Sequence, residues 1–240
     1  MLRLLHGWGL NRRVFAGLER ALALPCQSLD LPGHGEAPYE PGALDPERLA
    51  AQLAARYPSA QDWLGWSLGG LIALALAARH PHCVSRLILV AATPRFVRAP
   101  DWPHGTDPGV FAAFAAQLAV DHESTLRRFL TLQAGPGARA EVRALMADLA
   151  AGGAPQKAAL TEGLRVLQES DLRALLPAVR APTLVLHGSA DTIVSIEAAR
   201  AAASLMPAAR FYETGHSHAP FLNAPDECAA LIRNFLHERS

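Results

Sequence analysis

Short strand-like runs alternate with stretches of helical periodicity along most of this chain. Six runs have the length and apolar content of strands, at residues 2–5, 26–31, 62–66, 84–92, 182–188 and 210–214. Apolar residues at helical spacing follow several of these runs, at 46–56, 68–79, 196–206 and 225–238. Strands that alternate with helices predict an α/β fold with a parallel sheet covered by helices on both faces.

The middle of the chain departs from this alternation. Residues 95–176 contain no convincing strand, and their large apolar side chains recur every three or four positions, as in helices. A strand pattern resumes only at residue 182. We therefore predict an α/β core formed by residues 1–94 and 177–240, with the segment between them inserted as a helical cap.

Composition narrows the class of protein. Half of the 240 residues are hydrophobic, 18% are charged and the net charge is zero, which is an ordinary globular composition and gives no indication of nucleic-acid binding. The length is enough for one sizeable core or for a core with an inserted subdomain. No apolar run is long enough for a transmembrane helix, and the first ten residues lack the apolar region of a signal peptide. The three cysteines are scattered, which predicts buried thiols and no disulfide framework. We expect a cytoplasmic monomer that binds neither nucleic acid nor membranes.

A glycine-flanked serine lies between the third predicted strand and its helix. The pentapeptide GWSLG at 65–69 fits the pattern G-x-S-x-G, in which the serine occupies a sharp turn from strand to helix. Gly65 and Gly69 leave room for that turn, and the N-terminus of the helix favours negative charge. Ser67 is therefore a candidate nucleophile. The alternative is that it only caps the helix while the glycines allow close packing.

Two later segments contain the partners that a nucleophilic serine needs. Its hydroxyl requires a base and the base requires an orienting carboxylate, in the chain order Ser, Asp or Glu, His for this type of fold. Asp191 follows the strand predicted at 182–188, where an acid would face the carboxyl edge of the sheet; alternatively, it caps the next helix. His216 and His218 both follow the last predicted strand and compete for the role of base.

Two backbone N–H groups are candidates for an oxyanion hole. The residue after the nucleophile, Leu68, is expected to supply one of them. The loop HGWG at 6–9 follows the first strand, and the N–H of Trp8 within it is expected to supply the other. The alternative for this loop is an ordinary glycine turn.

The segments HGWG, GWSLG, SAD and HSHAP occur in the order found in α/β-hydrolases, and the chain resembles that family from Leu4 to its last helix. Within the family, LLHGWGLN, DLPGHG, WLGWSLGGL, RFLTLQ and HAPFLNAP resemble the BioH-type carboxylesterases. These enzymes hydrolyse the methyl ester of pimeloyl-acyl-carrier protein in biotin biosynthesis. In the family the catalytic histidine opens an H-A-P-F segment that ends in proline seven residues later. The resemblance therefore implies His218, not His216.

The resemblance also implies a reaction. His218, held by Asp191, takes the proton of Ser67. The serine attacks the ester carbonyl while the N–H groups of Trp8 and Leu68 hold the oxyanion. Methanol leaves, and water then releases the free acid. The family needs no metal and no organic cofactor for these steps.

The resemblance assigns substrate choice to the cap. The segment RRFLTLQ corresponds to the part of the family that lines the acyl channel, so the implied substrate-binding residues are Trp8, Leu68, Phe129, Leu130, Thr131, Leu132 and Gln133. The family also uses cap arginines to hold the acidic carrier protein, and the corresponding residues here are Arg128, Arg139 and Arg143, with Ser124 in place of a further arginine. A positive patch suits an acidic partner. The alternative is a solvated helix face balanced by acidic residues elsewhere in the cap.

The chain departs from the family near its start. The family usually begins with a hairpin ahead of the HGWG strand, whereas only five residues precede His6 here. We expect an α/β-hydrolase fold of about six strands, mostly parallel, with the strand at 26–31 at an edge. Either the N-terminal hairpin is absent or translation starts upstream.

Two other functions fit the same residues. A general short-chain carboxylesterase acting on small free esters would use the same serine, aspartate and histidine. A ligand-binding protein on a hydrolase scaffold would keep them but show negligible turnover. A dehalogenase of the same fold is disfavoured because it needs an aspartate where Ser67 stands.

Overall fold

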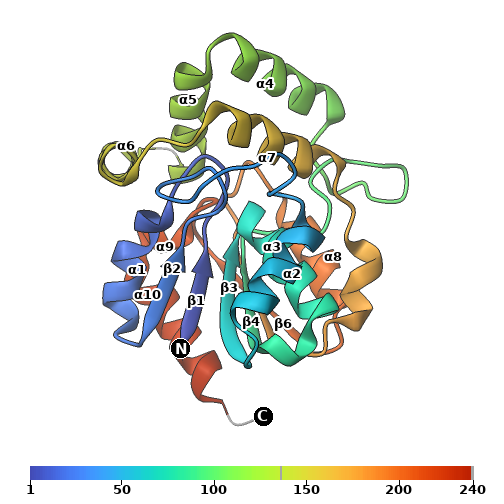
Figure 1. Ribbon diagram of the computed structural model, residues 1–240. Coiled ribbons are helices and arrows are strands. Elements are labelled where there is room, and N and C mark those ends of the chain that lie inside the picture. The colour runs from blue at the N-terminus through green and yellow to red at the C-terminus, as the bar shows by residue number, and fades with distance from the viewer. Residues whose placement is uncertain (136, 239–240) are drawn as a thin grey trace.

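One parallel sheet organises the fold of the computed structural model, which describes residues 1–135 and 137–238 (Figure 1). The strand order is β2-β1-β3-β4-β5-β6, and each neighbouring pair is parallel. The strands are β1 Leu2–Leu5, β2 Cys26–Leu29, β3 Gln61–Trp66, β4 Val84–Val90, β5 Thr183–Gly188 and β6 Ala209–Thr214. The prediction of a six-stranded sheet with the second strand at an edge is confirmed.

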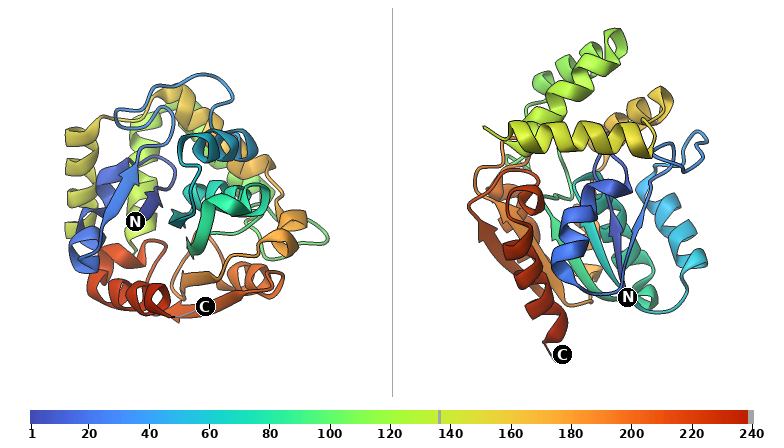
Figure 2. Two further views of the ribbon diagram at one scale, coloured as in Figure 1. Left: turned by 60° about the horizontal axis from the view of Figure 1, so that its bottom comes forward. Right: turned by 90° about the vertical axis from the view of Figure 1, so that its left-hand side faces the viewer.

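Helices pack on both faces of the sheet, as Figure 2 shows. One face is covered by α1 (Ala16–Leu22), α9 (Pro220–Asn223) and α10 (Pro225–His237). The other is covered by α2 (Pro46–Arg56), α3 (Leu68–Arg79) and α8 (Ile196–Ser204). Short 3-10 turns occur at η1 Arg12–Phe15, η2 Pro81–Cys83 and η3 Arg173–Ala178. Within the described ranges, no helix combines the length and apolar character needed to cross a membrane.

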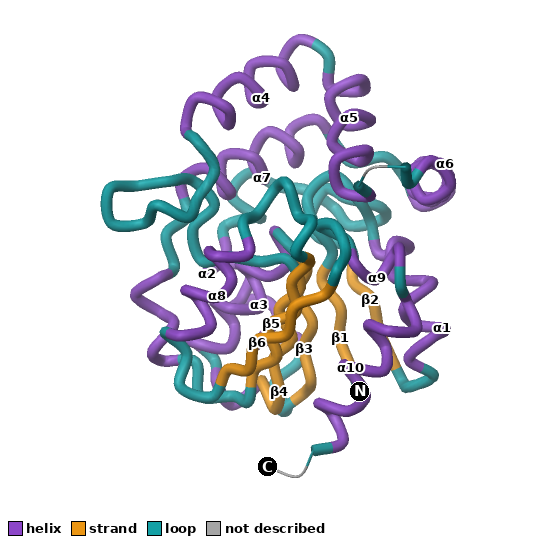
Figure 3. The backbone as a smooth tube through the Cα atoms, turned by 180° about the vertical axis from the view of Figure 1, so that it is seen from behind, coloured by secondary structure: helices purple, strands orange, loops and turns teal. Residues whose placement is uncertain are grey.

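Four helices lie over the carboxyl ends of the strands, at the top of Figure 1 and again in the view from behind in Figure 3. They are α4 (Pro108–Val120), α5 (His122–Ala134), α6 (Arg139–Gly152) and α7 (Lys157–Glu169). All four fall within the segment 95–176 for which a helical cap is predicted. Because parallel strands direct their carboxyl ends to one edge, the loops of that edge and the cap face each other.

A buried carboxylate fastens α7 to the core. Glu162 accepts hydrogen bonds from the Tyr39 hydroxyl at 2.7 Å, the Gly42 N–H at 3.0 Å and the Leu44 N–H at 2.9 Å. Burial, together with this carboxylate, raises the pKa of Tyr39 to about 12. Three donors compensate the cost of burying the charge, so this contact fixes α7 against the loop that precedes α2.

Candidate active site

Ser67 occupies a strained turn between β3 and α3. Its backbone angles are φ 55° and ψ −117°, a combination that is rare for a residue other than glycine. A Cβ at Gly69 would lie 2.3 Å from the Leu5 carbonyl oxygen, and one at Gly65 would lie 2.4 Å from the Gly69 carbonyl oxygen, so the turn requires both glycines. Ser67 makes no capping hydrogen bond to α3, which removes the capping alternative.

Asp191 and His218 form a buried pair beyond the ends of β5 and β6. His218 Nδ1 lies 2.8 Å from Asp191 Oδ2, and both side chains are fully buried. The other carboxylate oxygen accepts the N–H groups of Ile193 at 2.8 Å and Val194 at 3.0 Å. Ser195, not Asp191, caps α8. Asp191 is therefore held as an orienting carboxylate and not as a helix cap.

The charge state of this pair follows from its contacts. Burial alone raises the pKa of Asp191, but His218 and His187 lower it by more, so the net pKa is below its usual range and the group is ionised. An ionised carboxylate only accepts hydrogen bonds, so His218 carries its proton on Nδ1. Among the described residues Nε2 of His218 is buried without a partner, which leaves its lone pair available as a base.

His218 lies next to the turn that carries Ser67, whereas His216 points elsewhere. Trp66, directly before the serine, donates its indole N–H to the His218 carbonyl oxygen at 2.9 Å, and the two rings are 5.8 Å apart. His216 lies 3.0 Å from Glu227 at the start of α10. The structure thus places His218 with Asp191 and beside the serine turn, and gives His216 a surface partner.

The HGWG loop packs directly on the serine. A Cβ at Gly7 would lie 3.2 Å from the Ser67 Cβ, and Gly9 has a φ of 78° that favours glycine. Leu68 is the first residue of α3, so its N–H is one of the donors that a helix leaves free. Within residues 1–135 and 137–238, the backbone N–H of Trp8 has no hydrogen-bond acceptor. Two free donors thus flank the Ser67 turn.

A family model described as alpha/beta hydrolase family matches residues 4–231. The chain belongs to the alpha/beta hydrolase family. The fold class and the family resemblance predicted from the sequence are therefore confirmed.

Curated relatives narrow the comparison further. This hydrolase is 45% identical to the pimeloyl-[acyl-carrier protein] methyl ester esterase of Stenotrophomonas maltophilia (strain K279a), over 98% of this chain and 92% of that protein. It is 42% identical to the protein of the same name from Xanthomonas oryzae pv. oryzae (strain MAFF 311018), over 98% and 94%. The resemblance to esterases of this type is confirmed by these relatives.

Solved structures agree on the fold. An esterase from Exiguobacterium antarcticum superposes with a TM-score of 0.89 at 22% identity, covering 99% of this chain and 91% of that one. A bromoperoxidase from Bacillus anthracis has the same TM-score at 19% identity and the same coverage. At such identities the likeness concerns the architecture alone.

A cavity of about 130 Å³ extends from Ser67 of the hydrolase into the cap. Its wall is almost wholly apolar and includes aromatic rings from four segments, Trp8, Phe96, Phe111, Phe114 and Phe129. Trp8 meets Phe129 edge to face with ring centroids 5.0 Å apart. The wall contains hydroxyl groups but no charged side chain among the described residues. Such a site binds neutral acyl chains better than ions.

The predicted substrate-binding run on α5 is divided by helix geometry. Phe129 and Leu132, three positions apart on one face, line the cavity. Leu130 is buried in the hydrophobic core on the side of the sheet covered by α1, α9 and α10. Thr131 is exposed, and its hydroxyl donates a hydrogen bond to the Arg127 carbonyl oxygen. Gln133 is buried outside the cavity wall, and its side-chain amide has no hydrogen-bond partner in the described structure. The prediction of one continuous run is therefore too broad for the cavity as it stands.

The sequence does not indicate that the other cavity residues line a site. Phe111 and Phe114 stand out by helical spacing, but spacing does not say which way α4 faces. Leu164 and Leu167 on α7, and Thr192 and Ile193 after β5, also line the cavity. They are common residue types whose position at the site depends on how the cap sits on the core.

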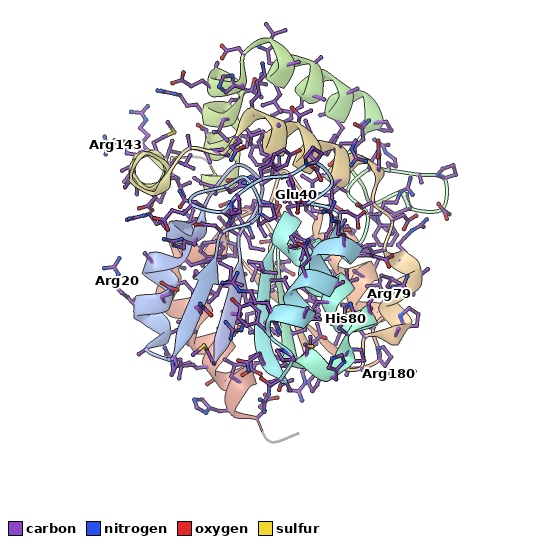
Figure 4. All side chains as sticks on the ribbon, in the orientation of Figure 1. Arg20, Glu40, Arg79, His80, Arg143 and Arg180 are labelled. Carbon is purple, nitrogen blue, oxygen red and sulfur yellow. The ribbon has the colours of Figure 1, made fainter. Side chains whose placement is uncertain are left out.

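The cap arginines are at the surface. Arg128, Arg139 and Arg143 are exposed, and none forms an ion pair with a residue that the structure describes. Arg128 is one helical turn from the cavity residue Leu132. Figure 4 shows Arg143 extending outward from α6. Ser124 is also exposed and lies in the first turn of α5.

Proposed function

We propose that this hydrolase is a carboxylesterase that hydrolyses the methyl ester of pimeloyl-acyl-carrier protein, releasing methanol, in biotin biosynthesis. The observation that carries the reaction is the buried Asp191–His218 pair beside the strained Ser67 turn. The substrate is supported by the 42–45% identity to esterases of that name. The uncharged cavity suits the neutral acyl chain that this substrate would place next to the serine.

The proposed mechanism uses one imidazole for two proton transfers in each half of the reaction. Nε2 of His218 takes the hydroxyl proton as Ser67 Oγ bonds to the ester carbonyl carbon, and Asp191 stabilises the imidazolium. The N–H groups of Trp8 and Leu68 stabilise the negative oxygen, at about 3 kcal/mol for each donor in comparable enzymes. His218 then protonates the departing methoxide. Water repeats the sequence on the acyl-serine and releases the acid.

Phe129 and Leu132 are the proposed contacts for the acyl chain, because both line the cavity. Arg128, Arg139 and Arg143 are the proposed contacts for the acidic carrier protein. Their lack of intramolecular partners in the described structure supports this role, since charges already paired would be less available to a partner.

We expect multiple turnovers on carrier-bound pimeloyl methyl ester, with a kcat/KM well above that for a small p-nitrophenyl ester. Methanol release and a shift in carrier mass would measure the first reaction, and absorbance the second. A preference for the small ester would favour the general short-chain esterase. One binding event without turnover on either substrate would favour the ligand-binding alternative. Complementation of a bacterium lacking the methyl esterase, in medium without biotin, tests the same proposal in the cell.

The double variant Arg139→Ala/Arg143→Ala is expected to lower kcat/KM for the carrier-bound ester roughly 5- to 30-fold, as for a loss of about 1–2 kcal/mol in surface charge contacts. Turnover of the small ester should not change. Arg20→Ala/Arg180→Ala is a matched control, because both residues lie on the core away from the cap in Figure 4. Equal losses in the two double variants, or no loss in either, would contradict carrier binding by α6.

A further inference from the structure

A second buried imidazole contacts the carboxylate of Asp191. His187, on β5, is fully buried. Its Nε2 lies 3.0 Å from the Val194 carbonyl oxygen and 3.3 Å from Asp191 Oδ2. Its Nδ1 is buried and has no partner among the residues that the structure describes. The proposed mechanism, which uses Ser67, Asp191 and His218, assigns no role to His187.

The contact with Val194 decides which nitrogen carries the proton. A carbonyl oxygen only accepts hydrogen bonds, so the N–H of His187 is on Nε2. A second proton on Nδ1 would be a buried charge without a partner, which is costly. His187 is therefore neutral, its single N–H is directed at the Val194 carbonyl oxygen, and Asp191 Oδ2 lies 3.3 Å from the same nitrogen as a second electrostatic contact.

Each carboxylate oxygen of Asp191 has its own set of contacts. Oδ1 accepts the N–H groups of Ile193 and Val194, and Oδ2 accepts Nδ1–H of His218 at 2.8 Å. His187 adds a longer contact to Oδ2 and also holds the carbonyl of Val194, whose N–H is one of the Oδ1 donors. One side chain thus restrains the carboxylate and the backbone turn that orients it.

We propose that His187 is a positioning residue of this hydrolase, which as a neutral Nε2–H donor fixes the turn at residues 191–194 and directs Asp191 Oδ2 toward His218. This proposal rests on the proposed roles of Asp191 and His218. A carboxylate free to rotate would hold the base less accurately, and misplacement by about 1 Å costs rate by up to about 100-fold. The donor also takes up part of the negative charge that would otherwise act on His218.

Few other charges bear on this cluster. The groups that act on the Asp191 carboxylate in the described structure are His218, from the loop after β6, and His187, from β5. Thr214, on β6, contacts the His187 carbonyl with a hydroxyl that does not titrate. A change in the pH dependence of a His187 variant is therefore a direct reading of this contact.

The test compares His187→Leu with His187→Gln, because the glutamine Nε2 amide can donate from the position of the imidazole Nε2. On a small ester, His187→Leu is expected to lower kcat about 10- to 100-fold with little change in KM. The acid limb of its kcat/KM profile should move to higher pH by about half a unit, because the imidazolium of His218 is then stabilised more. His187→Gln should restore most of both. An unchanged kcat and limb in folded His187→Leu, or equal losses in both variants, would overturn the proposal.

Nuclear magnetic resonance of ¹⁵N-histidine-labelled wild-type protein tests the contact without any variant. His187 is expected as the neutral Nε2–H tautomer at neutral pH, and an Nδ1–H tautomer or an imidazolium would overturn the proposal even if His187→Leu fails to fold. Absence of ester turnover in wild type would instead reject the proposed function, while the tautomer remains measurable. The two failures are therefore distinguishable.

Discussion

Replacing Ser67 with alanine is expected to lower kcat on ester substrates by about 10⁴-fold or more, and replacing His218 with alanine should have an effect of the same order. The serine supplies the bond to the acyl carbon, and the imidazole supplies and returns the proton, so neither has a substitute in the site. Because the two act as a unit, the double variant should lose little more than either single variant. Initial rates at saturating ester measure the loss.

His216→Ala is the control for the histidine assignment. Its ring lies on Glu227 at the surface and not on Asp191, so we expect a change in kcat of less than about threefold. A large loss in His216→Ala with a small loss in His218→Ala would reverse the assignment. Wild-type activity in Ser67→Ala would reject the covalent mechanism altogether.

The elements that could be predicted from the sequence are those whose signals are local. Helices α2 and α3 begin and end at the predicted residues because each has a clear amphipathic or apolar run with defined ends. Helix α1 was not predicted, since seven residues at 16–22 are too few for a periodic pattern to stand out. The strand predicted at 26–31 ends at Leu29, where the chain leaves the sheet edge.

The residues of the site likewise fall into those that a local motif indicates and those that only the fold brings together. Ser67, Asp191 and His218 are marked by motifs because each needs a particular turn and a fixed place after a strand. His187 lies one residue before Gly188 in a buried strand, and nothing in its neighbourhood shows that its ring meets Asp191. Likewise, only the packing of α5 on the core decides that Phe129 faces the cavity while Leu130 does not. Such contacts are set by tertiary structure.

Acidification from pH 6.5 to 5 is expected to destabilise the protein by about 3 kcal/mol, through His6 and His34. Burial is the main cause that lowers the pKa of His6 to about 3 and that of His34 to about 4. Their unfolded pKa is about 6.5, so between these values the unfolded chain binds more protons and stability falls as pH falls. Well below pH 6.5 each residue contributes about 1.4 kcal/mol per pH unit, and over this interval, which starts with the unfolded imidazoles half protonated, about 1.5 kcal/mol.

Protonation of His6 should also disturb the active site, because His6 connects the HGWG loop to a neighbouring loop. Its Nδ1 donates to the Gly7 carbonyl at 2.7 Å, and its Nε2 accepts the Leu31 N–H at 3.0 Å, which joins the HGWG loop to the loop after β2. A proton on Nε2 would abolish the second bond. The rings of His6 and His34 are 5.2 Å apart, so charging one also opposes charging the other.

His34→Asn isolates half of this effect, because an asparagine amide can keep the donor that His34 Nδ1 gives to the Pro32 carbonyl without titrating. Its unfolding free energy, measured in urea at pH 7, 6 and 5, should fall about half as steeply with pH as that of wild type. The control His82→Asn should match wild type, since His82 is exposed and takes no part in the buried pair. If the unfolding free energy of His34→Asn falls with pH as steeply as that of wild type, the acid sensitivity arises elsewhere. A slope half as steep would assign it to His6 and His34, which pack against the HGWG loop that contains Trp8.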